Sequence, residues 1–281
     1  MPYSKGTVIS KDGTVVGYRQ VGSGPGLILL HGGLQAAQDL MMLAEELSTS
    51  FAVYIPDRRG RGLSGRAGEG YGLGKECEDL EALLRESEAH RIFGLSSGGI
   101  VALYAALTLQ AIRQIAVYEP PLSSHSSTPL DWTDRYRREI EEGELPSAFV
   151  TVLKGTRTSP FLQHIPRIAL VPIMKWASRR DRNQKQGDVS LIQLIPTMEL
   201  DIRLVRETEN TIQTLASLEA DSLLLGGSRS PSYLRQTLRS LEQILPRTKR
   251  VEFKGLDHLG PSNGGNPRLV ATALKAFFAE I

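Results

Sequence analysis

The chain has very little cysteine, no long apolar run and almost no charge imbalance. Its 281 residues include one cysteine, Cys77, which excludes an internal disulfide framework. Cys77 shares helical spacing with Leu80 and Leu84, which indicates a small buried residue rather than a nucleophile. No stretch approaches the ~18 consecutive apolar residues of a membrane span, and residues 1–10 lack the apolar core of a secretion signal. We therefore expect a cytoplasmic protein with no membrane partner.

The charges are balanced, at 33 Lys and Arg against 31 Asp and Glu, and no block of basic residues stands out. This composition argues against a nucleic-acid partner. Arg58, Arg59 and Arg61 form a cluster, but they alternate with glycines and indicate a turn. The five histidines show no metal-ligand spacing and no phosphate-binding loop is visible, so we expect neither a metal nor another cofactor. A monomer or a homodimer is expected.

Short apolar runs alternate with helical patterns along most of the chain. Strands are expected at residues 7–9, 14–20, 27–30, 51–55, 91–95, 115–118, 222–225 and 250–253. This alternation predicts an α/β fold with a mostly parallel eight-stranded sheet and helices on both faces. In such a fold, functional groups are expected beyond the carboxyl ends of the strands.

Residues 122–216 break this alternation. The stretch is charged and helical in pattern, contains several prolines and shows no clear strand. We interpret it as a helical cap or lid inserted after the sixth strand, over a core formed by residues 1–121 and 217–281.

A serine between two glycines follows the fifth expected strand, in Gly94-Leu95-Ser96-Ser97-Gly98. This G-x-S-x-G pattern is typical of a sharp strand-to-helix turn that exposes a nucleophile. Only glycines fit two residues before and after such a serine, because the turn brings these positions together. A glycine- and serine-rich connection without chemistry is the alternative. Other polar groups also follow strands, including His31-Gly32-Gly33, the turn at 57–64 and Glu119.

These motifs, with Gly255-x-x-His258 after the last strand, resemble the α/β-hydrolase superfamily, in its serine-nucleophile, esterase- or lactonase-like branch. The resemblance implies that Ser96 is the nucleophile and His258 its base. It also implies an oxyanion hole formed by the backbone N–H groups of Ser97 and Gly33, with Leu34 as the alternative to Gly33. His31 is similar to a structural histidine of that family.

The acid of the expected triad departs from the common pattern of the superfamily. The loop after the seventh strand, where the resemblance places an aspartate, contains no acid, and we interpret its Ser230 as a helix cap. Glu119, directly after the sixth strand, is our candidate. Asp257 adjoins His258, and Asp221 belongs to the opposite end of the sheet, so both are weaker alternatives. A dyad without an acid is also possible.

The resemblance implies hydrolysis of a small apolar carboxylic ester or lactone through an acyl-enzyme. Hydrolysis of amides or carbon–carbon bonds by the same fold, and a receptor that binds a small molecule without turnover, are the alternatives. Tentative pocket residues are apolar; they are Leu34, Trp132, Phe149, Phe161 and Trp176. The four aromatic residues could equally form the core of the lid.

Overall fold

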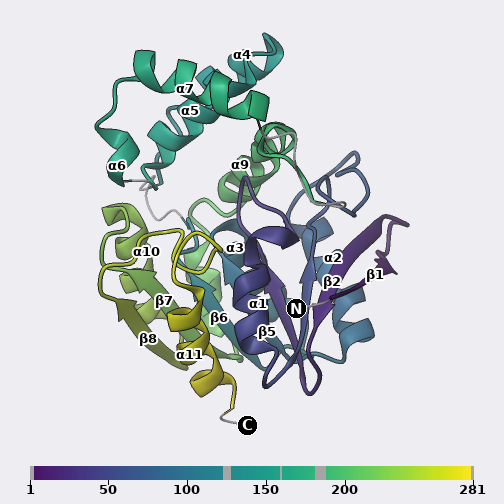
Figure 1. Cartoon of the computed structure of the whole chain (residues 1–281). Coiled ribbons are helices and arrows are strands. Elements are labelled where there is room, and N and C mark those ends of the chain that lie inside the picture. The colour runs from purple at the N-terminus through teal and green to yellow at the C-terminus, as the bar shows by residue number, and fades with distance from the viewer. Residues whose placement is uncertain (1–2, 123–127, 159, 181–187, 280–281) are drawn as a thin grey trace.

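The computed structural model describes residues 3–122, 128–158, 160–180 and 188–279. Its centre is an eight-stranded sheet in the order β1-β2-β4-β3-β5-β6-β7-β8 (Figure 1). The pairs β1–β2 and β2–β4 are antiparallel. All neighbouring pairs after them in this order, from β4–β3 to β7–β8, are parallel. The strands are β1 (Ser4–Ile9), β2 (Val15–Val21), β3 (Gly26–Leu30), β4 (Ala52–Pro56), β5 (Arg91–Leu95), β6 (Gln114–Tyr118), β7 (Asp221–Gly227) and β8 (Thr248–Phe253).

Helices cover both faces of this sheet. One face packs against α1 (Met41–Leu47) and α11 (Pro267–Phe278), which lie side by side. The other face packs against α2 (Leu73–Ser87), α3 (Ser97–Thr108) and α10 (Ser232–Ile244). A short 3-10 helix, η1 (Ala37–Leu40), precedes α1. The predicted mostly parallel eight-stranded sheet with helices on both sides is therefore confirmed.

The strand β3 shows why an unbroken apolar run forms the middle of the sheet. Leu27 and Leu29 pack into the cluster under α1 and α11, whereas Ile28 and Leu30 pack under α2 and α3. All four side chains are almost completely buried. A strand covered on both faces needs apolar residues at every position, because successive side chains point to opposite faces.

The order of the strands reverses at β3. From β3 the chain passes to β4 on one side and returns to β5 on the other, so β3 pairs with both. In parallel sheets, ligands bind at such a switch point, beyond the carboxyl ends of the two strands. The connections after β3 and β5 meet at this edge.

Between β6 and β7, the described residues form helices and no strand; we call residues 128–217 the helical insertion. Its helices are α4 (Thr133–Glu141), α5 (Leu145–Thr156), α6 (Pro160–Gln163), α7 (Arg167–Arg180), α8 (Leu191–Leu194), η2 (Ile195–Thr197), α9 (Met198–Glu207) and η3 (Ile212–Ser217). A separate apolar cluster, which includes Trp132, Tyr136 and Ile202, holds several of them together. In Figure 1, α9 lies between the sheet and the α4–α7 group. None of the helices described is both long and apolar enough to cross a bilayer.

The turn from β5 into α3 is crowded by backbone. An ideal Cβ on Gly98 would lie 2.5 Å from the carbonyl oxygen of Leu30 and 2.6 Å from that of His31. A Cβ on Gly94 would collide with the Gly98 carbonyl in the same way. These carbonyls belong to the main chain at the end of β3 and at the start of α3, where tight packing leaves little room for movement. Only glycine therefore fits at positions 94 and 98.

We expect Gly98→Ala to destabilise the protein by about 2–3 kcal/mol, because the added methyl group must displace the end of β3. Chemical denaturation measures this loss. Gly74→Ala is the matched control, since its Cβ would meet nothing within 4 Å; a change below about 1 kcal/mol is expected there. Equal effects of the two substitutions would contradict the crowding.

Candidate active site

Ser96 lies at the tip of the crowded turn, with φ 54° and ψ −124°. A non-glycine residue at this φ is strained, and the surrounding backbone must hold it there. Its own N–H donates to the carbonyl of Tyr118 at the end of β6, at 2.9 Å. Within the described part of the chain, no side chain is hydrogen-bonded to the Ser96 hydroxyl, which is partly exposed and opens into a cavity.

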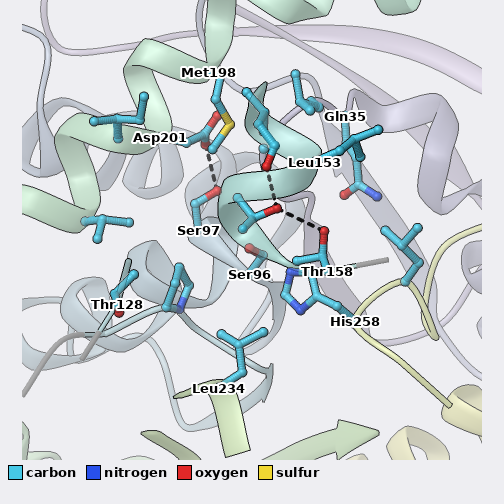
Figure 2. A pocket seen from close by; sticks show the side chains of 18 of the residues that line it. Gln35, Ser96, Ser97, Thr128, Leu153, Thr158, Met198, Asp201, Leu234 and His258 are labelled. Atoms are coloured by element: carbon cyan, nitrogen blue, oxygen red, sulfur yellow. Dashed lines mark hydrogen bonds between the residues drawn. The ribbon is translucent and has the colours of Figure 1, made fainter. Parts of the chain in front are cut away.

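His258 is oriented by a buried carboxylate. Its Nδ1 lies 2.8 Å from Oε2 of Glu119, whose side chain is fully buried, and the His258 side chain is 10% exposed. The other carboxylate oxygen of Glu119 accepts the backbone N–H of Gly227 at 2.7 Å. With the proton on Nδ1 shared with the carboxylate, the lone pair of the imidazole is on Nε2. His258 lines the same cavity as Ser96 (Figure 2).

Two glycines end β7, and the first of them, Gly226, makes room for the Glu119 carboxylate. A Cβ on Gly226 would lie 3.0 Å from Oε1 of Glu119, and one on Gly227 would collide with the carbonyl of Leu256. Glu119 itself has φ 50° and donates its N–H to the carbonyl of Leu225, so it extends the pairing of β6 with β7. The carboxylate thus crosses over the end of β7 to reach His258.

The other acids considered from the sequence lie elsewhere. Asp257 caps the backbone N–H of Leu259, and Asp221 pairs with Arg247 at the start of β7, the far end of the sheet. Ser230 does not cap α10, contrary to our expectation. The residue at the N-cap is Pro231, and the buried Ser230 hydroxyl has no hydrogen-bond partner among the described residues. Because Pro231 is extended, the helix starts one residue later than the sequence suggests.

His31 is completely buried and holds two loops together. Its Nδ1 lies 2.9 Å from the carbonyl of Gly32, and its Nε2 accepts the N–H of Arg58 at 3.1 Å. Burial, followed by the charges of Arg61 and Arg58, holds the pKa of His31 well below its usual value. His31 is thus a neutral imidazole with hydrogen bonds at both ring nitrogens, and it is not among the residues that line the cavity at Ser96. These contacts are typical of a structural role.

The backbone N–H groups that the resemblance implies for an oxyanion hole are available. Gly33, Leu34 and Ser97 all line the cavity beside Ser96. No acceptor in the described part of the protein is hydrogen-bonded to any of these three N–H groups. Leu34 has φ 56°, which turns its backbone sharply after the two glycines. Unpaired N–H groups beside a serine hydroxyl can stabilise a negative oxygen.

The cavity has a volume of about 390 Å³ and lies between the strand ends and the helical insertion. Its walls are mainly apolar, with contributions from Leu34, Trp132, Phe149 and Leu234. Two carboxyl groups, those of Asp39 and Asp201, also line it, but no lysine or arginine of the described residues does. Burial raises the pKa of Asp39 to about 6.

Of the five predicted pocket residues, three line the cavity. Leu34, Trp132 and Phe149 do so, and the two aromatic residues also pack into the core of the insertion. Trp176 does not: it lies on α7, 55% exposed, and is not part of the cavity wall. The sequence did not indicate which face of this charged helix Trp176 occupies. The side chain of Phe161 lies outside the described part of the structure.

Sequence reasoning missed a buried charged group beside Ser97. Asp201 of α9 accepts the hydrogen bond of the Ser97 hydroxyl at 2.7 Å (Figure 2). Arg58 and Arg61 form ion pairs with the same carboxylate. From the sequence, a carboxylate on a charged amphipathic helix is expected to face the solvent. The one available sign was the cluster of arginines in the turn after β4, which needs buried anions if it folds inward. In the described ranges, no histidines, cysteines or acids are grouped as metal ligands.

Known proteins similar to this chain share the fold. An alpha/beta hydrolase from Sphaerobacter thermophilus is 27% identical, with a TM-score of 0.77, over 97% of this chain and 100% of that one. A thermophilic esterase from Thermogutta terrifontis is 18% identical, with a TM-score of 0.73, over 100% and 99% of the two chains. An uncharacterized hydrolase of Bacillus subtilis, YraK, is 33% identical over 107 residues, or 37% of this chain. That match spans 39% of the length of YraK.

A model of the alpha/beta hydrolase family matches residues 27–273, from β3 into α11. This range includes the turn at Ser96, the buried Glu119 and the loop of His258. It also includes the complete parallel part of the sheet. The chain therefore belongs to the alpha/beta hydrolase family.

Proposed function

We propose that the protein is a serine hydrolase that cleaves carboxylic esters or lactones through an acyl-enzyme. The observation that carries this proposal is the 2.8 Å contact between His258 Nδ1 and Glu119 beside a cavity that also receives the Ser96 hydroxyl. A serine hydroxyl is a weak nucleophile until a base takes its proton. An imidazole whose Nδ1–H is held by a carboxylate has its basic nitrogen free for that step.

In the proposed reaction, Ser96 Oγ attacks the ester carbonyl while His258 Nε2 takes the hydroxyl proton. The carbonyl oxygen becomes negative and accepts the N–H groups of Ser97 and Gly33. Collapse of this intermediate breaks the bond to the alcohol, which leaves with the proton from His258. Water then attacks the acyl-enzyme with the same base, and the acid is released. Glu119 stabilises the imidazolium in both steps and stays ionised.

We also propose that the helical insertion acts as a cap over this site. Three of its residues, Trp132, Phe149 and Met198, line the cavity opposite the strand ends. Apolar walls on that side shield the reacting groups from bulk water, which strengthens the electrostatic interactions inside. The cap and the strand ends together determine which acyl or alcohol groups fit.

The charges around the cavity support an uncharged substrate. Asp39 lines it, and no lysine or arginine of the described residues does; Asp201 in the same wall is neutralised by Arg58 and Arg61. An additional carboxylate on the substrate would lose its hydration and meet the carboxyl group of Asp39 with no positive partner in the wall. A small apolar ester or lactone suits a cavity of this size and lining.

Ser96→Ala is expected to lower esterase turnover by at least ~10³-fold, since it removes the nucleophile. Hydrolysis of p-nitrophenyl butyrate measures this loss. A fluorophosphonate probe with peptide mapping is expected to label Ser96 in the natural protein. Ser217→Ala, at an exposed serine, is the control and is expected to keep full activity. Binding of ligands without any turnover by the natural protein would contradict the proposal and favour a receptor.

Glu119→Gln is expected to lower kcat by about 10³–10⁴-fold. The amide NH₂ of glutamine would face Nδ1, so the imidazole proton would move to Nε2 and the base would be lost. Asp257→Asn is the matched control, because Asp257 is the adjacent acid and only caps a backbone N–H. A near-normal rate for Glu119→Gln, together with a large loss for Asp257→Asn, would assign the acid to Asp257.

We expect kcat/KM for p-nitrophenyl methyl adipate to exceed that for p-nitrophenyl hydrogen adipate at least ~10-fold at pH 8, a difference of about 1.4 kcal/mol. The two esters have the same acyl chain and differ in the charge at its end. Steady-state kinetics, corrected for spontaneous hydrolysis, measures the ratio. Equal rates, or a preference for the anion, would exclude the proposed neutral-substrate selectivity.

A further inference from the structure

A buried set of ionic contacts joins the helical insertion to the turn of Ser96. We call Arg58, Arg61, Ser97 and Asp201 the Asp201 cluster. Arg58 Nη1 donates to Asp201 Oδ1 and to Ser97 Oγ, both at 3.0 Å, and Arg61 Nη2 donates to Asp201 Oδ2 at 2.6 Å. All four side chains are at most 2% exposed. Arg58 also pairs with the buried Glu76, which balances the second positive charge.

The Ser97 hydroxyl is both a donor and an acceptor within this cluster. It donates to Asp201 Oδ1 at 2.7 Å and accepts from Arg58, so its orientation is fixed from two sides. Ser97 is the first residue of α3, directly after the strained Ser96. Its backbone N–H, in contrast, has no acceptor among the described residues and lies at the cavity. A contact that fixes the side chain of Ser97 therefore also fixes the direction of this N–H.

The same carboxylate lies against the second segment that the proposed oxyanion hole uses. An ideal Cβ on Gly33 would be 3.1 Å from Asp201 Oδ2, so the carboxylate lies in the space beside Gly33 that a side chain would occupy. Burial alone would raise the pKa of Asp201, but the charges of Arg61 and Arg58 outweigh it and hold the pKa below its usual value. Asp201 is thus an ionised group that is hydrogen-bonded to Ser97 and lies beside Gly33.

We propose that Asp201 is a positioning residue, which acts through Ser97 and Gly33 to aim their N–H groups at the developing oxyanion. This inference rests on the proposed function. It assigns α9 a part in the chemistry, although α9 belongs to the insertion and not to the sheet. Arg58 and Arg61 hold the carboxylate in place and neutralise it, so that it orients the two segments without repelling the negative oxygen.

Two substitutions test this proposal through different atoms. Ser97→Ala keeps every charge and the backbone N–H but deletes the link to Asp201. Asp201→Asn keeps the shape of the side chain but removes its charge. We expect kcat to fall about 10-fold in Ser97→Ala and 10- to 100-fold in Asp201→Asn, part of the 10²–10³-fold effect of losing one oxyanion donor. KM is expected to change less than 2-fold.

A second measurement separates positioning from folding. An alkyl trifluoromethyl ketone adds to the nucleophilic serine and places a negative oxygen in the oxyanion hole. Its inhibition constant is expected to rise in each variant by the factor by which kcat/KM falls. Asp79→Asn is the control, since Asp79 also forms a buried pair with an arginine of the same turn, Arg59, and within the described residues it has no hydrogen bond to Ser97. It is expected to lower Tm and to leave kcat unchanged.

Three results would overturn the inference. One is a normal kcat in folded Ser97→Ala, which decides the matter if Asp201→Asn does not fold. Another is an increase in KM alone, which would make Asp201 a substrate-binding residue. The third is an inhibition constant that does not change while kcat falls. Failure of the proposed function itself is distinguishable, because the natural protein would then take up no fluorophosphonate at Ser96.

Discussion

The site depends on the close approach of two backbone segments, the end of β3 and the turn between β5 and α3. The carbonyls of Leu30 and His31 occupy the space that a side chain at position 98 would need. This contact keeps Ser96 in its strained conformation and brings the N–H groups of Gly33 and Ser97 to one side of the cavity. The strain is maintained because both segments are anchored in strands buried on two faces.

A second constraint comes from the end of β6. Glu119 continues the pairing with β7 by one residue and then turns its carboxylate over the Gly226–Gly227 pair to reach His258. Glu119 has a positive φ, and a side chain at Gly226 would crowd its carboxylate, whereas a side chain at Gly227 would collide with the carbonyl of Leu256. The carboxylate that contacts His258 therefore comes from the end of β6, and a glycine at the end of β7 leaves room for it.

The sheet was predictable because burial on both faces imposes unbroken apolar runs such as residues 27–30, and such runs are visible in a single sequence. The tight packing around Ser96 was predictable, because glycines two residues before and two residues after a serine indicate that no side chain fits there. Glu119 could be proposed because it directly follows the sixth strand, whereas Asp221 precedes its strand and Asp257 adjoins His258. The roles of Ser96, His258 and Glu119 in a reaction stay predictions, although the structure brings His258 to Glu119 and both His258 and Ser96 to one cavity.

The sequence did not predict the tertiary contacts of the insertion. Asp201 and Trp176 both lie on helices with charged faces, and periodicity did not reveal that the aspartate is buried and the tryptophan exposed. Ser230 was misread because a serine before a proline resembles a cap, whereas the extended Pro231 takes that position. In each case the missing information was the partner on a distant segment.

The way α9 is held separates two kinds of position in the insertion. Ion pairs tie α9 to the turn after β4, whereas Ile202 of α9 packs with Tyr136 of α4 and Ala148 of α5 in an apolar cluster. Apolar packing tolerates substitution if volume is kept, but removal of one partner of a buried ion pair leaves an uncompensated charge. The apolar wall that α4 and α5 contribute is therefore the part of the site that can be reshaped, with α9 retained as its fixed boundary.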